Sequence, residues 1–154
     1  MRARLVLAAS LLAACAAHHP HRARSHSPAA GRITLSLVGT SDLHGRLAML
    51  PWLAGHVANL RRAREHDGAV LLADAGDLFQ GTLESNLNEG AAVLRAYNAM
   101  GYAAVAVGNH EFDYGPEGEA VFARAPTDDP RGALRARVGE ARFPWLMANI
   151  VDAD

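Results

Sequence analysis

The chain carries the same arrangement three times: a short apolar run that ends in a loop of polar residues. The apolar runs lie at residues 33–38, 69–73 and 103–107. Each has the length of a strand and is rich in aliphatic or β-branched residues. The run at 69–73 is apolar throughout, which is typical of a strand that is covered on both faces. Such strands, separated by helical stretches, predict a parallel sheet with right-handed crossover helices.

The loops after these runs contain side chains that suit a divalent metal ion. Their sequences are TSDLHG at 40–45, AGDLFQG at 75–81 and GNHEFDYG at 108–115. Carboxylate and amide oxygens suit a hard cation, and an imidazole suits either a metal or a proton. Ligands of open parallel sheets bind outside the carboxyl ends of the strands. The three loops therefore predict one site at that edge of the sheet.

Apolar residues at intervals of three and four indicate amphipathic helices between the strands. Gly101 provides a natural stop for the helix before it. Pro116, followed by an acidic residue, has the composition of a helix start. The expected helices lie at about 49–66, at 88–100, from 116 onward and at 132–142, and a fourth strand is expected at 145–150. The predicted fold class is therefore α/β.

The N-terminus indicates export. Residues 1–15 have a basic start, a short apolar core and small residues before Cys15, which is the pattern of a secretory signal. The apolar core is too short to span a bilayer. Leu12-Ala13-Ala14-Cys15 resembles a bacterial lipobox, so we expect Cys15 to be lipidated. A plain signal peptide that contains a cysteine is the alternative. The expected location is the periplasmic face of the outer membrane or the surface of a bacterial cell, with the membrane contacted through Cys15.

A linker and one domain are expected after the signal. Residues 16–31 are rich in Ala, His, Arg, Ser and Pro and predict a disordered tether, although their histidines can also bind a metal loosely. Residues 32–154 are expected to form the domain. The net charge of −1 gives no indication of a nucleic-acid partner.

Three motifs, in order, resemble the calcineurin-like metallophosphoesterases, and within them the 5'-nucleotidase and UDP-sugar hydrolase family. They are D-x-H at 42–44, G-D at 76–77 and G-N-H-E at 108–111, with the branch-specific Q-G at 80–81 and F-D at 112–113. The resemblance covers nearly all of residues 32–151. It implies the N-terminal half of a metallophosphoesterase α/β sandwich, with a mostly parallel sheet and crossover helices.

The resemblance also implies two divalent metal ions, of Mn, Zn, Mg or Co. Asp42 and His44 would hold the first ion, Asp77 would bridge the two, and Asn109 would hold the second. Two such ions polarise a phosphoryl group and lower the pKa of a water molecule. A polar cleft that holds magnesium or water without turnover is the simpler alternative.

Two further residues have roles implied by the same resemblance. His110 would act on the phosphate or the leaving group, with Asp113 orienting its ring. Glu111, between them, is expected to be structural. The implied reaction is hydrolysis of a phosphoric ester, most simply of a nucleotide or UDP-sugar. Thiosulfohydrolase or cyclic phosphodiesterase relatives remain open, because leaving-group specificity lies elsewhere in such proteins.

The distal motifs of the family, a histidine and G-H-x-H, do not follow Asp113. We therefore expect an N-terminal fragment with an incomplete metal site and weak activity or none. One face of its sheet would then lose the cover that the rest of such a fold supplies. Its protein partner would be the missing C-terminal half or a second copy. The alternative from another class is a non-catalytic lipoprotein fragment that binds metal weakly or binds a partner.

Overall fold

The computed structural model describes residues 31–149. The signal, Cys15 and nearly all of the predicted linker lie outside the described residues. Among the described residues, none of the helices combines the length and the apolar character needed to span a membrane.

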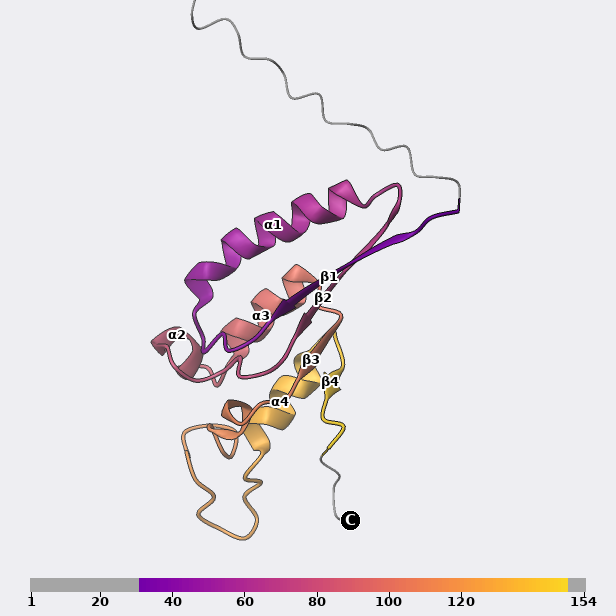
Figure 1. The fold of residues 1–154 in the computed structure, drawn as a ribbon. Helices are drawn as coiled ribbons and strands as arrows, with labels where there is room; N and C mark the ends of the chain where they lie inside the picture. Colours follow the sequence, from indigo (N-terminus) through magenta and orange to yellow (C-terminus); the bar gives the residue numbers. More distant parts are fainter. Residues whose placement is uncertain (1–30, 150–154) are drawn as a thin grey trace, which may run out of the picture. The chain divides into compact units, whose positions relative to one another are not determined.

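The sheet has four parallel strands in the order β1-β2-β3-β4 (Figure 1). They are β1 (Thr34–Thr40), β2 (Gly68–Asp74), β3 (Ala104–Ala106) and β4 (Trp145–Leu146). β1 and β2 pair along their whole length, from Thr34 beside Gly68 to Thr40 beside Asp74. The predicted parallel α/β fold is confirmed.

The fourth strand is much shorter than the predicted range of 145–150. Val105 pairs with Trp145 and Ala106 with Leu146, and the Val107 N–H still donates to the Leu146 carbonyl at 3.1 Å. Beyond that point the chain after β3 turns into the 108–115 loop. β4 then has no neighbour to pair with, so it ends.

The helices connect successive strands. They are α1 (Leu50–Ala63), preceded by the 3-10 turn η1 (Leu47–Met49), then α2 (Leu83–Asn86), α3 (Ala91–Met100), the 3-10 turn η2 (His110–Phe112) and α4 (Gly132–Glu140). Strands that lie in sequence order with right-handed crossovers place all connecting helices on one face of the sheet. On that face Leu72 and Val105 are buried with Val57, Val93 and Tyr97 of the helices.

Two helix boundaries have clear local causes. Gly101 adopts a left-handed conformation with φ of +69° and ends α3, as predicted. Thr82 caps the start of α2, since its hydroxyl accepts from the Ser85 N–H at 3.3 Å. This short helix was not among those predicted from the sequence.

The helix predicted from Pro116 onward is absent: the segment up to α4 consists of bends and turns. Gly115 and Gly118 have φ of +70° and +105°, so the backbone leaves the helical region on both sides of Pro116. Pro126 and Pro130 then lack the N–H that a helix interior needs. The prediction was wrong because Pro116 favours the start of a helix only where the flanking backbone can be helical, and Gly115 and Gly118 are not.

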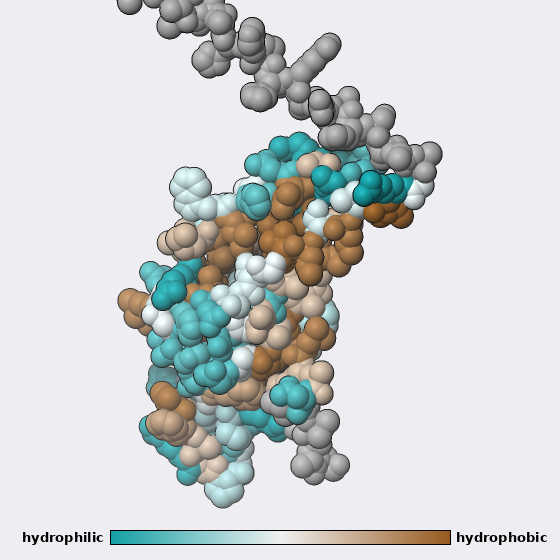
Figure 2. Space-filling model, in the orientation of Figure 1, coloured by the Kyte–Doolittle hydropathy of each residue, from teal (hydrophilic) through white to brown (hydrophobic). Residues whose placement is uncertain are grey.

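The opposite face of β1 and β2 is apolar and exposed. Leu35 and Leu37 are 61% and 73% exposed, and Leu71, paired with Leu37, is 40% exposed. Figure 2 shows hydrophobic residues gathered over these two strands. In the part of the chain that the structure describes, the second strand is therefore covered on one face only, although its composition is typical of a strand covered on both.

Candidate metal centre

The loop after β1 is held beside the loop after β2. Backbone N–H groups of Asp42, His44 and Gly45 donate to the carbonyls of Gly76, Asp77 and Leu78 at 3.0, 3.0 and 2.9 Å. Asp42 and His44 both have positive φ, +54° and +48°, which non-glycine residues adopt only when their surroundings hold them there. These bonds bring both side chains to the same edge as Asp77.

Glycine at 76 and 108 lets the loops after β2 and β3 approach each other. A Cβ on Gly108 would lie 2.2 Å from Asp77 Oδ1, and one on Gly76 would lie 2.7 Å from the Gly108 nitrogen. The His110 N–H then donates to Asp77 Oδ1 at 3.1 Å. The glycines of the second and third motifs are therefore needed because the close approach of the two loops leaves no room for a side chain.

Three of the predicted ligands form a cluster. One ligand atom from each of Asp42, His44 and Asp77 lies within 4.8 Å of the others. Two carboxylates and an imidazole suit a divalent cation of the Mn, Zn, Mg or Co type, and a thiolate is not part of the cluster. The residues present fit such an ion.

Asn109, the fourth predicted ligand, is exposed at the start of η2. It lies between Gly108 and His110, both of which border Asp77. The structure thus brings the Asn109 backbone to the same edge of the sheet, and its role as a ligand remains a prediction.

His44 is oriented by a backbone carbonyl. Its Nδ1 lies 3.3 Å from the Gln80 oxygen, and its Nε2 lies 3.9 Å from Asp42 Oδ1. A carbonyl oxygen only accepts, so Nδ1 carries the hydrogen in this contact. Nε2 is then the nitrogen that is available to a cation.

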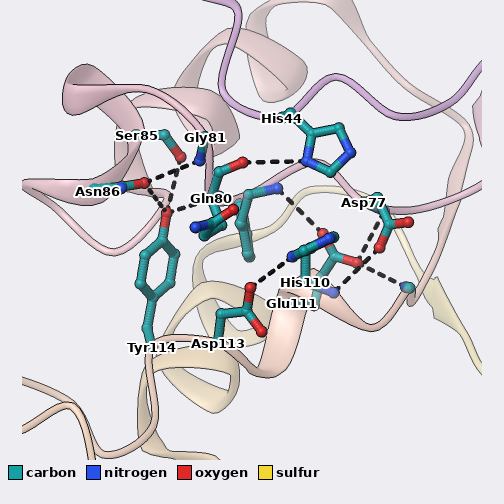
Figure 3. Close-up of polar contacts among 12 residues, drawn as sticks. His44, Asp77, Gln80, Gly81, Ser85, Asn86, His110, Glu111, Asp113 and Tyr114 are labelled. Atoms are coloured by element: carbon teal, nitrogen blue, oxygen red, sulfur yellow. Dashed lines mark hydrogen bonds and ion pairs between the residues drawn. The ribbon is translucent and has the colours of Figure 1, made fainter.

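His110 and Asp113 form the expected pair. Their Nδ1 and Oδ2 atoms lie 2.6 Å apart, and this hydrogen bond is the main cause of a pKa of His110 above its ordinary value. The His110 ring meets the His44 ring edge to face, with centroids 4.7 Å apart. Figure 3 shows His44, Asp77 and His110 gathered between the loops that carry them. The contact is as predicted, whereas the catalytic role is still a prediction.

Glu111, expected to be structural, joins two of the loops. Its side chain is 1% exposed. One oxygen accepts from the N–H groups of Leu78 and Phe79 at 2.7 and 3.3 Å, and the other accepts from those of Asp77 and Gly108 at 3.0 and 2.6 Å. A single buried carboxylate therefore connects the backbones after β2 and β3.

Asp74 orders the turn after β2. Its Oδ1 accepts from the Gly76 N–H at 2.7 Å, and its Oδ2 accepts from the Tyr97 hydroxyl at 2.9 Å. Burial is the main cause of a raised pKa of Tyr97, so this hydroxyl remains a donor.

A group of polar residues that was not predicted from the sequence lies beside the cluster. The Tyr114 hydroxyl accepts from the Gln80 N–H at 2.9 Å and donates to Asn86 Oδ1 at 3.0 Å. No periodicity points to Tyr114. The available signal was its position directly after Asp113 in a loop that already carried the site.

Together these contacts define an α/β protein with a candidate metal centre at the carboxyl edge of a parallel sheet. The family model for calcineurin-like phosphoesterases matches residues 35–141. The chain belongs to the calcineurin-like phosphoesterase family.

Similar proteins include several nucleotidases. Human 5'-nucleotidase is 35% identical over 137 residues, which cover 80% of this chain and 21% of that protein. The trifunctional nucleotide phosphoesterase protein YfkN of Bacillus subtilis is 34% identical over 125 residues, or 80% of this chain and 8% of that protein. The crystal structure of a 5'-nucleotidase precursor from Thermus thermophilus superimposes with a TM-score of 0.55 at 34% identity, covering 75% of this chain and 22% of that one. The chain thus spans about a fifth of the length of the human relative.

Proposed function

We propose that this chain carries part of the active site of a metal-dependent phosphoric ester hydrolase that acts on nucleotides. The observation that carries the proposal is the convergence of three loops, with ligand atoms of Asp42, His44 and Asp77 within 4.8 Å and the His110 ring against His44. The similarity to proteins named 5'-nucleotidase supports a nucleotide phosphoester as the substrate class.

The proposed ligands of the first metal ion are Asp42, His44 and Asp77. Asp77 would also contact a second ion, together with Asn109. Two divalent ions, when bound, polarise a phosphoryl oxygen and lower the pKa of a water molecule. The second ion would have only two of these ligands, so we expect it to bind weakly, and we expect turnover to need further ligands.

His110 is proposed to hold the proton that the reaction needs. Its Nδ1–H donates to Asp113, which leaves Nε2 to donate to the phosphate or to the leaving group. The pKa of His110 is raised, mainly by this bond, so the ring keeps its second proton at a higher pH than a free imidazole does. Asp113 is therefore proposed as the residue that orients the His110 ring and stabilises its protonated form.

Titration of the chain with Mn²⁺, followed by NMR, tests the metal assignment. We expect paramagnetic broadening first at the amides near Asp42, His44 and Asp77, and we expect Asp77→Ala to abolish it. Broadening confined to the histidines of residues 16–31 would contradict the proposal. Release of phosphate from 5'-AMP by the chain, combined with a C-terminal half that supplies the further ligands, then tests activity. In that combination His110→Ala should lower turnover and leave Mn²⁺ affinity largely unchanged.

We further propose that residues 1–15 export the chain and that Cys15 anchors it through lipid, with residues 16–31 as a linker to the domain at 32–154. Leu12-Ala13-Ala14-Cys15 supports this proposal. Replacing Cys15 with Ser should move the protein from the membrane fraction to the soluble fraction of a bacterial host. A wild-type chain that is already entirely soluble would contradict the lipid anchor.

A further inference from the structure

The orientation of His44 depends on one peptide unit of the neighbouring loop. The Gln80 carbonyl faces His44 Nδ1 at 3.3 Å, and Asp42 Oδ1 lies 3.9 Å from Nε2 on the other side of the ring. This carbonyl selects the tautomer with hydrogen on Nδ1, since a carbonyl oxygen has no hydrogen to give. Movement of the Gln80 peptide would therefore change which ring nitrogen offers a lone pair to a metal.

The backbone at Gln80 and Gly81 adopts a conformation that is unfavourable without contacts from neighbouring residues. Gln80 has φ of +54°, a left-handed conformation that is unfavourable for a residue with a Cβ. Gly81, which follows, has φ of +132°, and a Cβ there would lie 2.7 Å from the His44 carbonyl oxygen. A strained segment of this kind persists only where surrounding contacts hold it.

The Tyr114 hydroxyl and its partner Asn86 supply those contacts. It accepts from the Gln80 N–H at 2.9 Å, donates to Asn86 Oδ1 at 3.0 Å, and lies 3.0 Å from Ser85 Oγ. Because the hydroxyl has a single hydrogen, which goes to Asn86, the serine must be the donor in the last contact. Asn86 Oδ1 also accepts from the Gly81 N–H at 3.3 Å, so two successive peptides are held from one hydroxyl and its partner (Figure 3).

We propose that Tyr114 is a positioning residue for His44. Its hydroxyl holds the Phe79–Gln80 peptide directly and, through Asn86, the Gln80–Gly81 peptide, whose carbonyl keeps the hydrogen of His44 on Nδ1 and leaves Nε2 for the metal. Tyr114 directly follows Asp113, the partner of His110. One short segment thus orients both histidines of the site. The metal-binding part of this inference rests on the proposed function, whereas the tautomer of His44 is a property of the metal-free chain.

The test is Tyr114→Phe, which removes only the hydroxyl. Long-range ¹H–¹⁵N correlation spectra of the metal-free chain, recorded with the imidazole neutral, report which His44 nitrogen carries hydrogen. The His44 signals are identified by their loss in His44→Ala. We expect the wild type to carry hydrogen on Nδ1 and Tyr114→Phe to move toward a mixture of tautomers. Mn²⁺ affinity, measured by calorimetry, should fall about tenfold, as is usual when a residue that orients a metal ligand is lost.

Tyr102→Phe is the matched control. It removes a buried hydroxyl whose neighbour is Thr40 Oγ1, at 3.0 Å, rather than Gln80 or His44. It should leave the tautomer of His44 and the Mn²⁺ affinity unchanged. Urea unfolding of both variants separates a loss of stability from a change at His44.

Asn86→Ala provides a second route if Tyr114→Phe does not fold. Asn86 is exposed, and its loss removes the acceptor of both the Tyr114 hydroxyl and the Gly81 N–H. It should shift the His44 tautomer in the same direction. A Nδ1–H tautomer unchanged in both variants, or a wild type with hydrogen on Nε2, would overturn the inference. A wild type that binds no Mn²⁺ would instead overturn the proposed function, and the tautomer measurement would still decide the role of Tyr114.

Discussion

Replacing Glu111 should destabilise the chain more than replacing any exposed acidic residue. Its carboxylate is 1% exposed and accepts from four backbone N–H groups at 2.6–3.3 Å. Two variants separate shape from hydrogen bonding. Glu111→Gln keeps the shape but replaces one oxygen by an amide nitrogen that cannot accept, and Glu111→Ala removes both acceptors.

The expected loss follows from these bonds. A hydrogen bond to a charged group contributes about 1.5–3 kcal/mol, and such bonds to one group are not additive. Glu111→Ala leaves four backbone N–H groups without their acceptor. A buried donor left unpaired costs about 1–3 kcal/mol, and because such costs are not additive we expect a total loss of about 3–5 kcal/mol. Glu111→Gln turns two N–H groups toward an NH₂ group, and we expect a loss of about 2–3 kcal/mol from these unpaired donors.

Equilibrium unfolding in urea, with secondary structure followed by circular dichroism, measures these losses. Glu119→Gln is the control, because Glu119 is exposed and a substitution of that kind changes stability by about 0.5 kcal/mol or less. The expected order of stability is control, Glu111→Gln, Glu111→Ala. A loss below about 1 kcal/mol for Glu111→Ala would show that the loops after β2 and β3 are held together without the carboxylate.

Three further predictions concern the site and the sheet. Asp113→Asn should lower the pKa of His110, measured by NMR titration. The raised pKa of His110 stabilises the folded chain fully below the unfolded pKa of 6.5, and this stabilisation disappears as the pH rises through the folded pKa. The variant should therefore be less stable than wild type mainly at acidic pH. Equal His110 titration curves would contradict this. Gly108→Ala should lower Mn²⁺ affinity at least about tenfold, because its Cβ would meet Asp77 Oδ1 at 2.2 Å, and unchanged calorimetry would refute the steric argument. Leu37→Lys, at a position 73% exposed on the apolar sheet face, should reduce aggregation measured by light scattering without loss of helix signal, and equal scattering would show that this face does not associate.

The amino-acid sequence by itself determined the features that depend on local chemistry. Apolar runs that end in glycine and polar residues indicated parallel strands, and Gly101 indicated the end of α3, because each signal lies within a few residues of its effect. The types of the site residues were also readable. Asp42, His44 and Asp77 each follow a strand end, and the carboxyl ends of parallel strands share one edge.

Only the tertiary structure decided how the loops hold one another. Glu111 bonds to backbone groups 32–34 residues earlier, and Tyr114 bonds to the Gln80 backbone 34 residues earlier, so neither partner can be identified from spacing. The same holds for β4, which ends where β3 stops offering partners. The sequence led us to expect an uncovered sheet face, but only the tertiary structure decided that this face carries Leu35 and Leu37, because an apolar side chain indicates only that burial is favourable.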